Sequence, residues 1–220
     1  MKGMQSATAP QPRTRASKQA RREQLIEATL NAIERKGLTA FTLADVADGA
    51  GLSRGIVNFH FESKDKLLVA VLMQLSDEYD RNWRAELAAA PADNATRLRT
   101  LMLADLSPRI CTPGKLAAWF GFYGEAASRP DLRDLCWGRD DAYLDALDEI
   151  CTGLKAEVGY DFAPAKTAMS LYAMQEGLWL RLMLGNGELR LDEAVEVSLA
   201  SLGLLFPRHF SPEGDLLDRG

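Results

Sequence analysis

Apolar and polar residues follow a helical period along almost the whole chain. In the first clear example, Leu25, Ile26, Thr29 and Ile33 form one apolar face of a helix that runs from about residue 18 to 36 and stops at a glycine. No segment shows sustained period-two alternation. We therefore expect an all-α fold without a sheet.

Capping residues, prolines and glycines set the limits of the other predicted helices. Two short helices begin at Leu43 and directly after Ser53. The longer ones are expected at about residues 64–89, 93–106, 113–128, 131–158, 164–184 and 192–206. Since no apolar run reaches about 18 residues, we expect no passage through a membrane.

Residues 41–68 place three capped helix starts around a glycine turn. Thr42 and Ser53 are suited to cap two short helices, Gly51 lies in the turn between them, and Ser63 is suited to cap a third helix. This arrangement is typical of a helix-turn-helix, whose second helix enters the major groove of DNA. A plain helical hairpin is the alternative, but it does not require three caps in so short a segment.

The outward residues of the second short helix are predicted to meet base edges. Arg54 can pair with guanine and Asn58 with adenine, while Gly55 lets the backbone approach the duplex. Hydroxyl, imidazole and ammonium groups nearby can donate to phosphates, which fixes register without reading sequence. The full predicted DNA-binding set is Thr42, Ser53, Arg54, Gly55, Asn58, Phe59, His60 and Lys64.

Residues 20–70 resemble the DNA-binding domain of the tetracycline-repressor (TetR) family. The matching positions are the run 34–37, Thr42, the turn from Ala47 to Ser53, Gly55 and the closing run 61–68. Where the family usually has a tyrosine that often contacts a phosphate, this chain has Asn58, which leaves base reading and phosphate contact both open for that residue. The resemblance implies an all-helical homodimer with DNA-binding heads and a ligand-sensing, dimerising body.

The charge distribution agrees with this division. The whole chain has a formal net charge of −5, which by itself does not suggest a nucleic-acid binder. Residues 1–70, however, hold 11 Lys/Arg against 7 Asp/Glu, and the remainder holds 15 against 24. The basic excess lies where phosphates would be, and the acidic body would be repelled by DNA.

We expect four parts along the chain: a disordered basic arm (1–17), a helix-turn-helix DNA-binding domain (18–66), a helical ligand-binding and dimerisation domain (67–207) and a flexible tail (208–220). Contact of the arm with DNA and a loose terminus are both open. The helix over 64–89 links head and body. The last two helices are apolar on more than one face, which suits a four-helix dimer bundle whose two-fold symmetry matches a palindromic operator in double-stranded DNA.

Aromatic residues gather on three predicted helices of the body. Tyr172, Glu176 and Trp179 are spaced so that all three share one helix face. Aromatic rings beside a carboxylate suit a quaternary ammonium held by cation–π attraction, whereas rings that only fill the core are the alternative interpretation. The predicted ligand-binding set is Trp119, Phe122, Tyr123, Tyr143, Tyr172, Glu176 and Trp179.

Two short runs, 115–123 and 177–181, are similar to the choline-responsive (BetI-like) branch of the TetR family. This resemblance implies choline as the small-molecule effector and osmoprotectant-synthesis genes as targets. Two alternatives stay open. One is a regulator that senses a bulky hydrophobic compound, for which a methionine-containing body is suitable; the other is a DNA-binding protein without an effector.

Other chemistry has little support in the sequence. The acidic run at 140–149 is typical of a solvated helix face, and no glycine-rich phosphate loop or serine elbow is present. His60 and His209 have no metal-ligand spacing to the cysteines. We therefore expect no catalytic residues, no metal and no cofactor. Three cysteines without a C-x-x-C pair indicate reduced thiols in a cytoplasmic protein.

Overall fold

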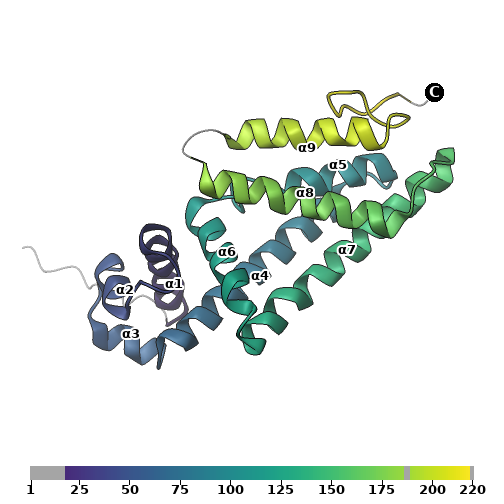
Figure 1. Ribbon diagram of the computed structural model, residues 1–220. Helices are drawn as coiled ribbons and strands as arrows, with labels where there is room; N and C mark the ends of the chain where they lie inside the picture. Colours follow the sequence, from purple (N-terminus) through teal and green to yellow (C-terminus); the bar gives the residue numbers. More distant parts are fainter. Residues whose placement is uncertain (1–17, 186–188, 219–220) are drawn as a thin grey trace, which may run out of the picture.

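The computed structural model describes residues 18–185 and 189–218, and this part of the chain folds into nine α-helices (Figure 1). The helices are α1 (Lys18–Lys36), α2 (Leu43–Gly49), α3 (Arg54–His60), α4 (Lys64–Ala89), α5 (Asn94–Asp105), α6 (Pro113–Ala126), α7 (Pro130–Val158), α8 (Pro164–Leu184) and α9 (Leu191–Leu205). The all-α expectation is confirmed, and the predicted helix limits agree with these to within two residues. The predicted arm over 1–17 lies outside the described residues. None of the described helices is long and apolar enough to cross a membrane.

Side-chain caps explain several of the helix starts. The hydroxyls of Ser63 and Thr112 and the carboxylate of Asp93 each accept a hydrogen bond from the backbone N–H three residues later. Such caps satisfy amide groups that have no partner within the helix. Pro113 follows Thr112 at the first position of α6, where its missing N–H costs nothing.

The head consists of α1, α2 and α3 around one apolar core. Phe41, Val46, Val57 and Phe61 are all buried there. Gly51 closes the turn between α2 and α3 with a φ of +63°, a conformation that favours glycine. Figure 1 shows α4 leaving this head and running into the body, so the predicted link between the two parts is one continuous helix.

A second contact between head and body was not predicted: α6 packs against α1. A Cβ atom on Gly114 would lie 3.1 Å from the carbonyl oxygen of Leu30, and one on Gly121 would lie 2.9 Å from the Cβ of Leu38. The two glycines are seven residues apart and therefore lie on one face of α6. They allow the helix to approach the head more closely than any side chain would.

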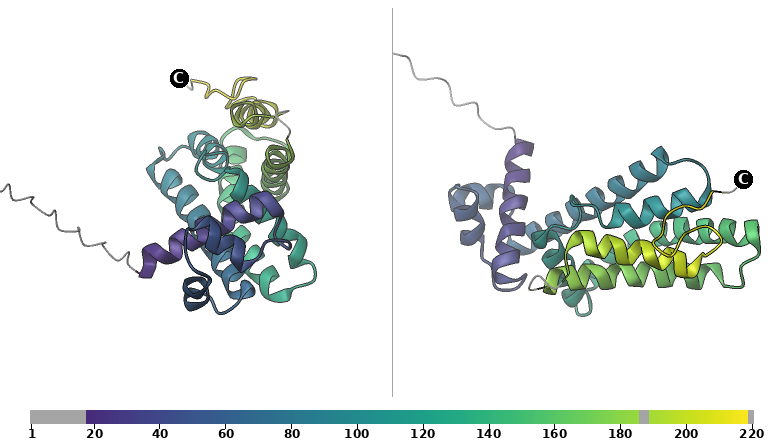
Figure 2. Two further views of the ribbon diagram at one scale, coloured as in Figure 1. Left: turned by 90° about the vertical axis from the view of Figure 1, so that its left-hand side faces the viewer. Right: turned by 90° about the horizontal axis from the view of Figure 1, so that it is seen from above.

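The last two helices, α8 and α9, lie side by side on one face of the body (Figure 2). Large apolar side chains on them remain exposed to solvent: Met169, Leu184, Val197 and Leu204, the last with 83% of its surface accessible. Exposed apolar side chains on neighbouring helices are typical of a protein interface. It lies on the two helices that the sequence predicts to be apolar on several faces.

The prediction of a flexible tail from residue 208 is wrong for the described residues up to 218. Phe210 and the His209 ring are buried, and Phe210 forms an isolated antiparallel bridge with Leu216. His209 lies between the Tyr160 hydroxyl (2.8 Å from Nδ1) and a Glu157 carboxylate oxygen (3.0 Å from Nε2). The segment has no helical period, so its attachment to the end of α7 depends on tertiary contacts that sequence patterning does not detect.

Candidate DNA interface and effector site

The start of α2 is fixed by a capping box. The Thr42 hydroxyl accepts from the backbone N–H of Asp45, whose carboxylate in turn accepts from the backbone N–H of Thr42 at 2.9 Å. A hydrogen bond from Lys36, together with those from Thr42, lowers the pKa of Asp45 to about 2. Thr42 was predicted to donate to a phosphate, but its hydroxyl also lies 2.9 Å from the Asp45 carboxylate. Thr42 thus fixes the position of α2 by local hydrogen bonds.

One side of α3 is presented to solvent and the other is packed on the head. Arg54, Asn58 and Phe59 are exposed, whereas Val57 is buried. The exposed hydroxyl of Ser53 makes no capping hydrogen bond, although the backbone has the cap geometry. Recognition helices contact base edges with outward residues near their N-terminus, so α3 presents the predicted residues in a suitable way.

Neither the space around position 55 nor its backbone conformation requires a glycine there. A Cβ atom added there would meet only the Ser53 hydroxyl, at 3.8 Å, and its φ lies in the ordinary range. A glycine inside a helix costs about 0.5–1 kcal/mol relative to alanine. The absence of a side chain on this exposed side of α3 is therefore better explained by a partner outside the chain that approaches closely.

Basic residues of α1 lie beside the end of α3. Partial burial lowers the pKa of His60, and the positive charges of Lys18, Arg22 and Arg21 lower it further. The guanidinium of Arg22 also lies 4.8 Å from the centre of the Phe61 ring. These three α1 residues were not among the predicted DNA contacts, because helical periodicity does not reveal that the start of α1 lies near α3.

Lys64 is expected to contact a phosphate, but its ammonium makes hydrogen bonds within the protein. Its ammonium donates to the carbonyl oxygens of Thr39 and Phe41, both at 2.7 Å, and lies 4.1 Å from the centre of the Phe41 ring. Burial lowers the pKa of this lysine. Two of its three donors are thus used within the protein, and the side chain holds the first turn of α4 against the loop that precedes α2.

In the body, a narrow cavity lies between α4, the end of α5 and α8, and its lining side chains leave no room for a water molecule. Its lining residues are Tyr79, Asp105, Tyr172, Glu176 and Trp179. The three predicted α8 residues are brought together here, and the Tyr143 ring packs behind them against Tyr79 and Tyr172. The predicted α6 residues are not among the lining residues: Trp119 and Phe122 are buried elsewhere in the core, and Tyr123 is half-buried against Trp119.

Sequence reasoning missed Tyr79 and Asp105, although Asp105 is the buried carboxylate of this cavity. Its Oδ1 accepts from the Tyr79 hydroxyl at 2.5 Å, and its backbone carbonyl accepts from the Trp179 indole N–H at 3.0 Å. Burial, together with the charge of Asp105, raises the pKa of Tyr143 well above its ordinary value. The cavity therefore combines aromatic faces with two carboxylates, a composition that favours an organic cation over an anion or a neutral molecule.

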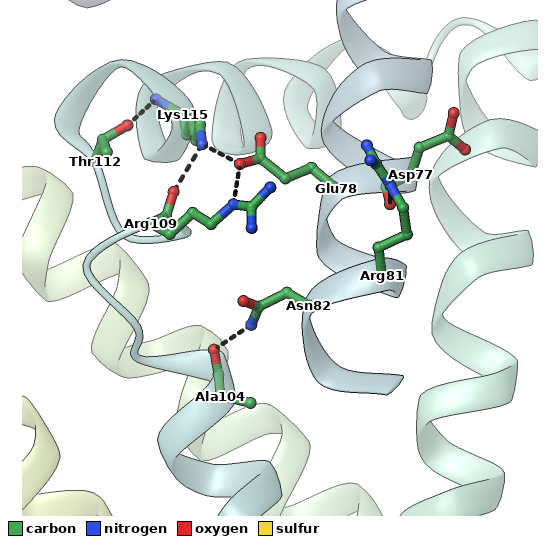
Figure 3. A network of polar contacts seen from close by, with 8 residues as sticks. All are labelled: Asp77, Glu78, Arg81, Asn82, Ala104, Arg109, Thr112 and Lys115. Carbon is green, nitrogen blue, oxygen red and sulfur yellow. Dashed lines mark hydrogen bonds and ion pairs between the residues drawn. The ribbon is translucent and has the colours of Figure 1, made fainter. Parts of the chain in front are cut away.

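Next to the cavity, polar contacts join α4 to the end of α5, to the turn that follows it and to the first turn of α6. Figure 3 shows Glu78 extending from α4 toward Lys115 and Arg109, with distances of 2.8 and 3.0 Å. Burial alone would raise the pKa of Glu78, but the hydrogen bonds from Lys115 and Arg109 outweigh it and lower the pKa. Asn82, one turn later, donates to the carbonyl of Ala104 at 2.9 Å. The cavity wall and α4 are thus connected on both sides of Tyr79.

Comparison with known proteins gives matches for both parts of the chain. Residues 25–71 match the family described as bacterial regulatory proteins, tetR family, and residues 91–207 match the BetI-type transcriptional repressor C-terminal family. The HTH-type transcriptional regulator BetI of Burkholderia thailandensis is 33% identical over 189 residues, which cover 84% of this chain and 93% of that protein.

Solved structures agree on the fold. A transcriptional regulator from Pseudomonas aeruginosa PAO1 is 27% identical with a TM-score of 0.72, and the match covers 88% of this chain and 94% of the other. A regulator from Saccharomonospora viridis, solved in complex with choline, is 23% identical with the same TM-score, covering 90% and 98% of the two chains.

Proposed function

Because the chain belongs to the TetR family and is a DNA-binding transcriptional repressor with a BetI-type C-terminal domain, we propose that a quaternary ammonium of the size of choline is the effector that controls it. The cavity formed by Tyr79, Tyr172 and Trp179 with Asp105 and Glu176 is the observation that carries this proposal. Aromatic faces attract such a cation by about 0.5–2 kcal/mol per ring, and the carboxylates add its counter-charge. The choline complex of the Saccharomonospora viridis neighbour supports the same chemistry.

The charge of the cavity argues against the bulky hydrophobic effector. The cavity is lined by the carboxylate of Asp105, which is buried. A large apolar compound would leave that carboxylate without water or a counter-ion. A small cation matches this charge and requires the lining side chains to move apart less than a bulky compound does.

The effector signal travels through α4 in this proposal. Tyr79 lines the cavity, and fifteen residues earlier on the same helix Lys64 is hydrogen-bonded to the loop that precedes α2. A cation that draws on Asp105 changes the position of Tyr79 and so the pose of α4 relative to the head. Since recognition helices must meet successive major grooves about 34 Å apart, a displacement of a few Å weakens DNA binding.

We further propose that the exposed apolar faces of α8 and α9 pair with those of a second copy. The resulting two-fold symmetric dimer would place two α3 helices on the half-sites of a palindromic operator. Its place of action is then the compartment of the DNA, the cytoplasm. Light scattering of the purified protein tests this: a mass of twice 24.2 kDa supports the pairing, and a monomer contradicts it.

The effector is tested by fluorescence anisotropy of the full chain on DNA from upstream of its own gene, with and without millimolar choline. Release by choline supports the proposal. Tight binding that ignores choline but responds to hydrophobic compounds would replace it by the second candidate. Tight binding that responds to neither would indicate a DNA-binding protein without an effector.

A further inference from the structure

The most exposed aromatic surface in the head belongs to Phe59, which has 75% of its surface in contact with solvent. Its ring makes an edge contact with His60, at 5.4 Å between ring centres, and is otherwise directed away from the core. The neighbouring exposed positions of α3 carry Arg54 and Asn58, which are polar. One large apolar group therefore lies among hydrogen-bonding groups on the solvent-exposed side of α3.

Gly55 lies one helical turn before Phe59, on the same face of α3. Because a Cβ atom at Gly55 would meet nothing closer than 3.8 Å within the protein, the surface in front of it is open. A duplex can approach the helix backbone there, and the Phe59 ring is the next group that it meets. Gly55 thus leaves open space beside the helix, and Phe59 places an apolar ring next to that space.

The base edges in the major groove offer few apolar partners. The 5-methyl group of thymine is the apolar group that distinguishes one base pair from the others there, and phenylalanine is one of the side chains that contacts it. The positive charges of Lys18, Arg21 and Arg22 beside the end of α3 favour approach of the phosphate backbone on this side. The basic residues of α1 thus attract the duplex, Gly55 leaves space for it to approach α3, and Phe59 presents an apolar ring to the base edges.

We propose that Phe59 is a specificity-determining residue that takes the 5-methyl group of a thymine in each half-site, with Gly55 allowing the approach. This inference rests on the proposed function, since it requires α3 to lie in the major groove. It assigns the apolar part of sequence recognition to Phe59 and leaves hydrogen-bonded recognition to Arg54 and Asn58.

The test removes the methyl group without changing base pairing. An operator is first enriched from a random duplex pool with the full-length protein and then resynthesised with deoxyuridine in place of one thymine at a time. For the wild-type protein, replacing the contacted thymine in both half-sites should weaken binding by about 15-fold, since one buried methylene-sized group corresponds to about fourfold per half-site. Phe59→Ala should bind the unmodified operator with the same loss and be insensitive to that deoxyuridine.

Two further measurements separate a methyl contact from a general loss of binding. Phe59→Leu keeps an apolar side chain and should retain part of the deoxyuridine effect. An operator with 5-methylcytosine at the same position should bind the wild-type protein better than one with plain cytosine, because only the former restores the methyl group.

The outcomes distinguish this inference from the proposed function. If the wild-type protein enriches an operator but no deoxyuridine substitution weakens it, or if Phe59→Ala remains equally sensitive, the methyl contact is overturned and DNA binding stands. If no operator is enriched at all, the proposed function fails, and the inference fails with it.

Discussion

Across the cavity between α4, α5 and α8, the hydroxyl of Tyr79 donates a hydrogen bond of 2.5 Å to the buried carboxylate of Asp105. Tyr79 belongs to the helix that continues into the head, whereas Asp105 ends α5. Under the proposed function, a cation in the cavity competes for the same carboxylate. The bond therefore connects the cavity directly to the helix that continues into the DNA-binding head.

Replacing Asp105 by asparagine should separate ligand binding from folding. The amide keeps an acceptor for Tyr79 but removes the negative charge, so we expect the dissociation constant for choline to rise by at least about tenfold. The free energy of unfolding should be unchanged or higher, because a buried carboxylate no longer has to be desolvated. Titration calorimetry and thermal unfolding measure the two effects. Unchanged choline affinity in a folded Asp105→Asn protein would exclude Asp105 as the counter-charge.

Two tryptophan variants test which rings belong to the effector cavity. Trp179→Leu removes a lining ring and should weaken choline binding by about 2- to 30-fold. Trp119→Leu removes a buried ring that does not line the cavity, so it should lower the free energy of unfolding by about 3 kcal/mol and leave the choline affinity of the folded protein unchanged. Loss of choline binding in a folded Trp119→Leu protein would show that the site extends to α6.

Gly55→Ala should change stability and DNA binding in opposite directions. The added methyl group meets open space and improves helix propensity, so the free energy of unfolding should rise by about 0.5–1 kcal/mol. Affinity for the operator should nevertheless fall, because the methyl group keeps the duplex away from α3. Chemical denaturation and anisotropy on the operator test both parts. An equally tight complex would mean that no partner comes close to this position.

The ion pair between Glu78 and Lys115 should contribute stability that depends on pH. The folded pKa of Glu78 lies below the ordinary value of 4.5, so its contribution is complete above that value and is lost as the pH falls through the lower folded pKa. We expect Glu78→Gln to cost about 1 kcal/mol near neutral pH, a figure reduced for partial exposure to solvent. Denaturation at pH 3 to 7 should show the difference between wild type and Glu78→Gln shrinking with acid. A difference that is constant over this range would contradict the ion pair.

Two cysteines should be unreactive in the folded protein. Burial, with smaller contributions from the nearby carboxylates, raises the pKa of Cys111 and of Cys151 to about 12. At pH 8 almost no thiolate is then present, so alkylation by iodoacetamide should be much slower than in the denatured chain. Site-resolved mass spectrometry measures both rates. Equal rates in the native and denatured states would show that these thiols are accessible and ionised.

Much of the helical framework could be predicted because its signals are local. Caps such as Thr112 with Pro113, and the glycine turn at Gly51, act within a few residues of where they lie. The cavity could be predicted only in part. Tyr172, Glu176 and Trp179 share one helix face and were identified by spacing, whereas Tyr79 and Asp105 come from other helices and join them only through tertiary packing.

The roles of individual polar groups were harder to predict for the same reason. Lys64 is a cationic residue at a position where a phosphate contact is expected. In the folded head, however, its ammonium donates to the carbonyl oxygens of Thr39 and Phe41. The segment from residue 208 is expected to be a flexible tail, yet His209 and Phe210 are buried against the end of α7 and α9. The position of the Lys64 side chain and that of the segment from residue 208 are both set by partners that are distant in sequence.

The close fit of Gly114 of α6 against Leu30 of α1, and of Gly121 against Leu38 in the turn after α1, limits how freely this repressor can be recombined. A chimeric biosensor that takes only residues 18–66 and joins them to another body would set a foreign α6 against this α1, and any side chain at either glycine position would force the two apart. The transplantable module is therefore larger than the DNA-binding domain and includes the face of α6 that the head rests on. A sensor engineered on this scaffold should therefore keep the head and α6 together and exchange the effector pocket. Replacing the head on an otherwise unchanged body would disturb the contact with α6.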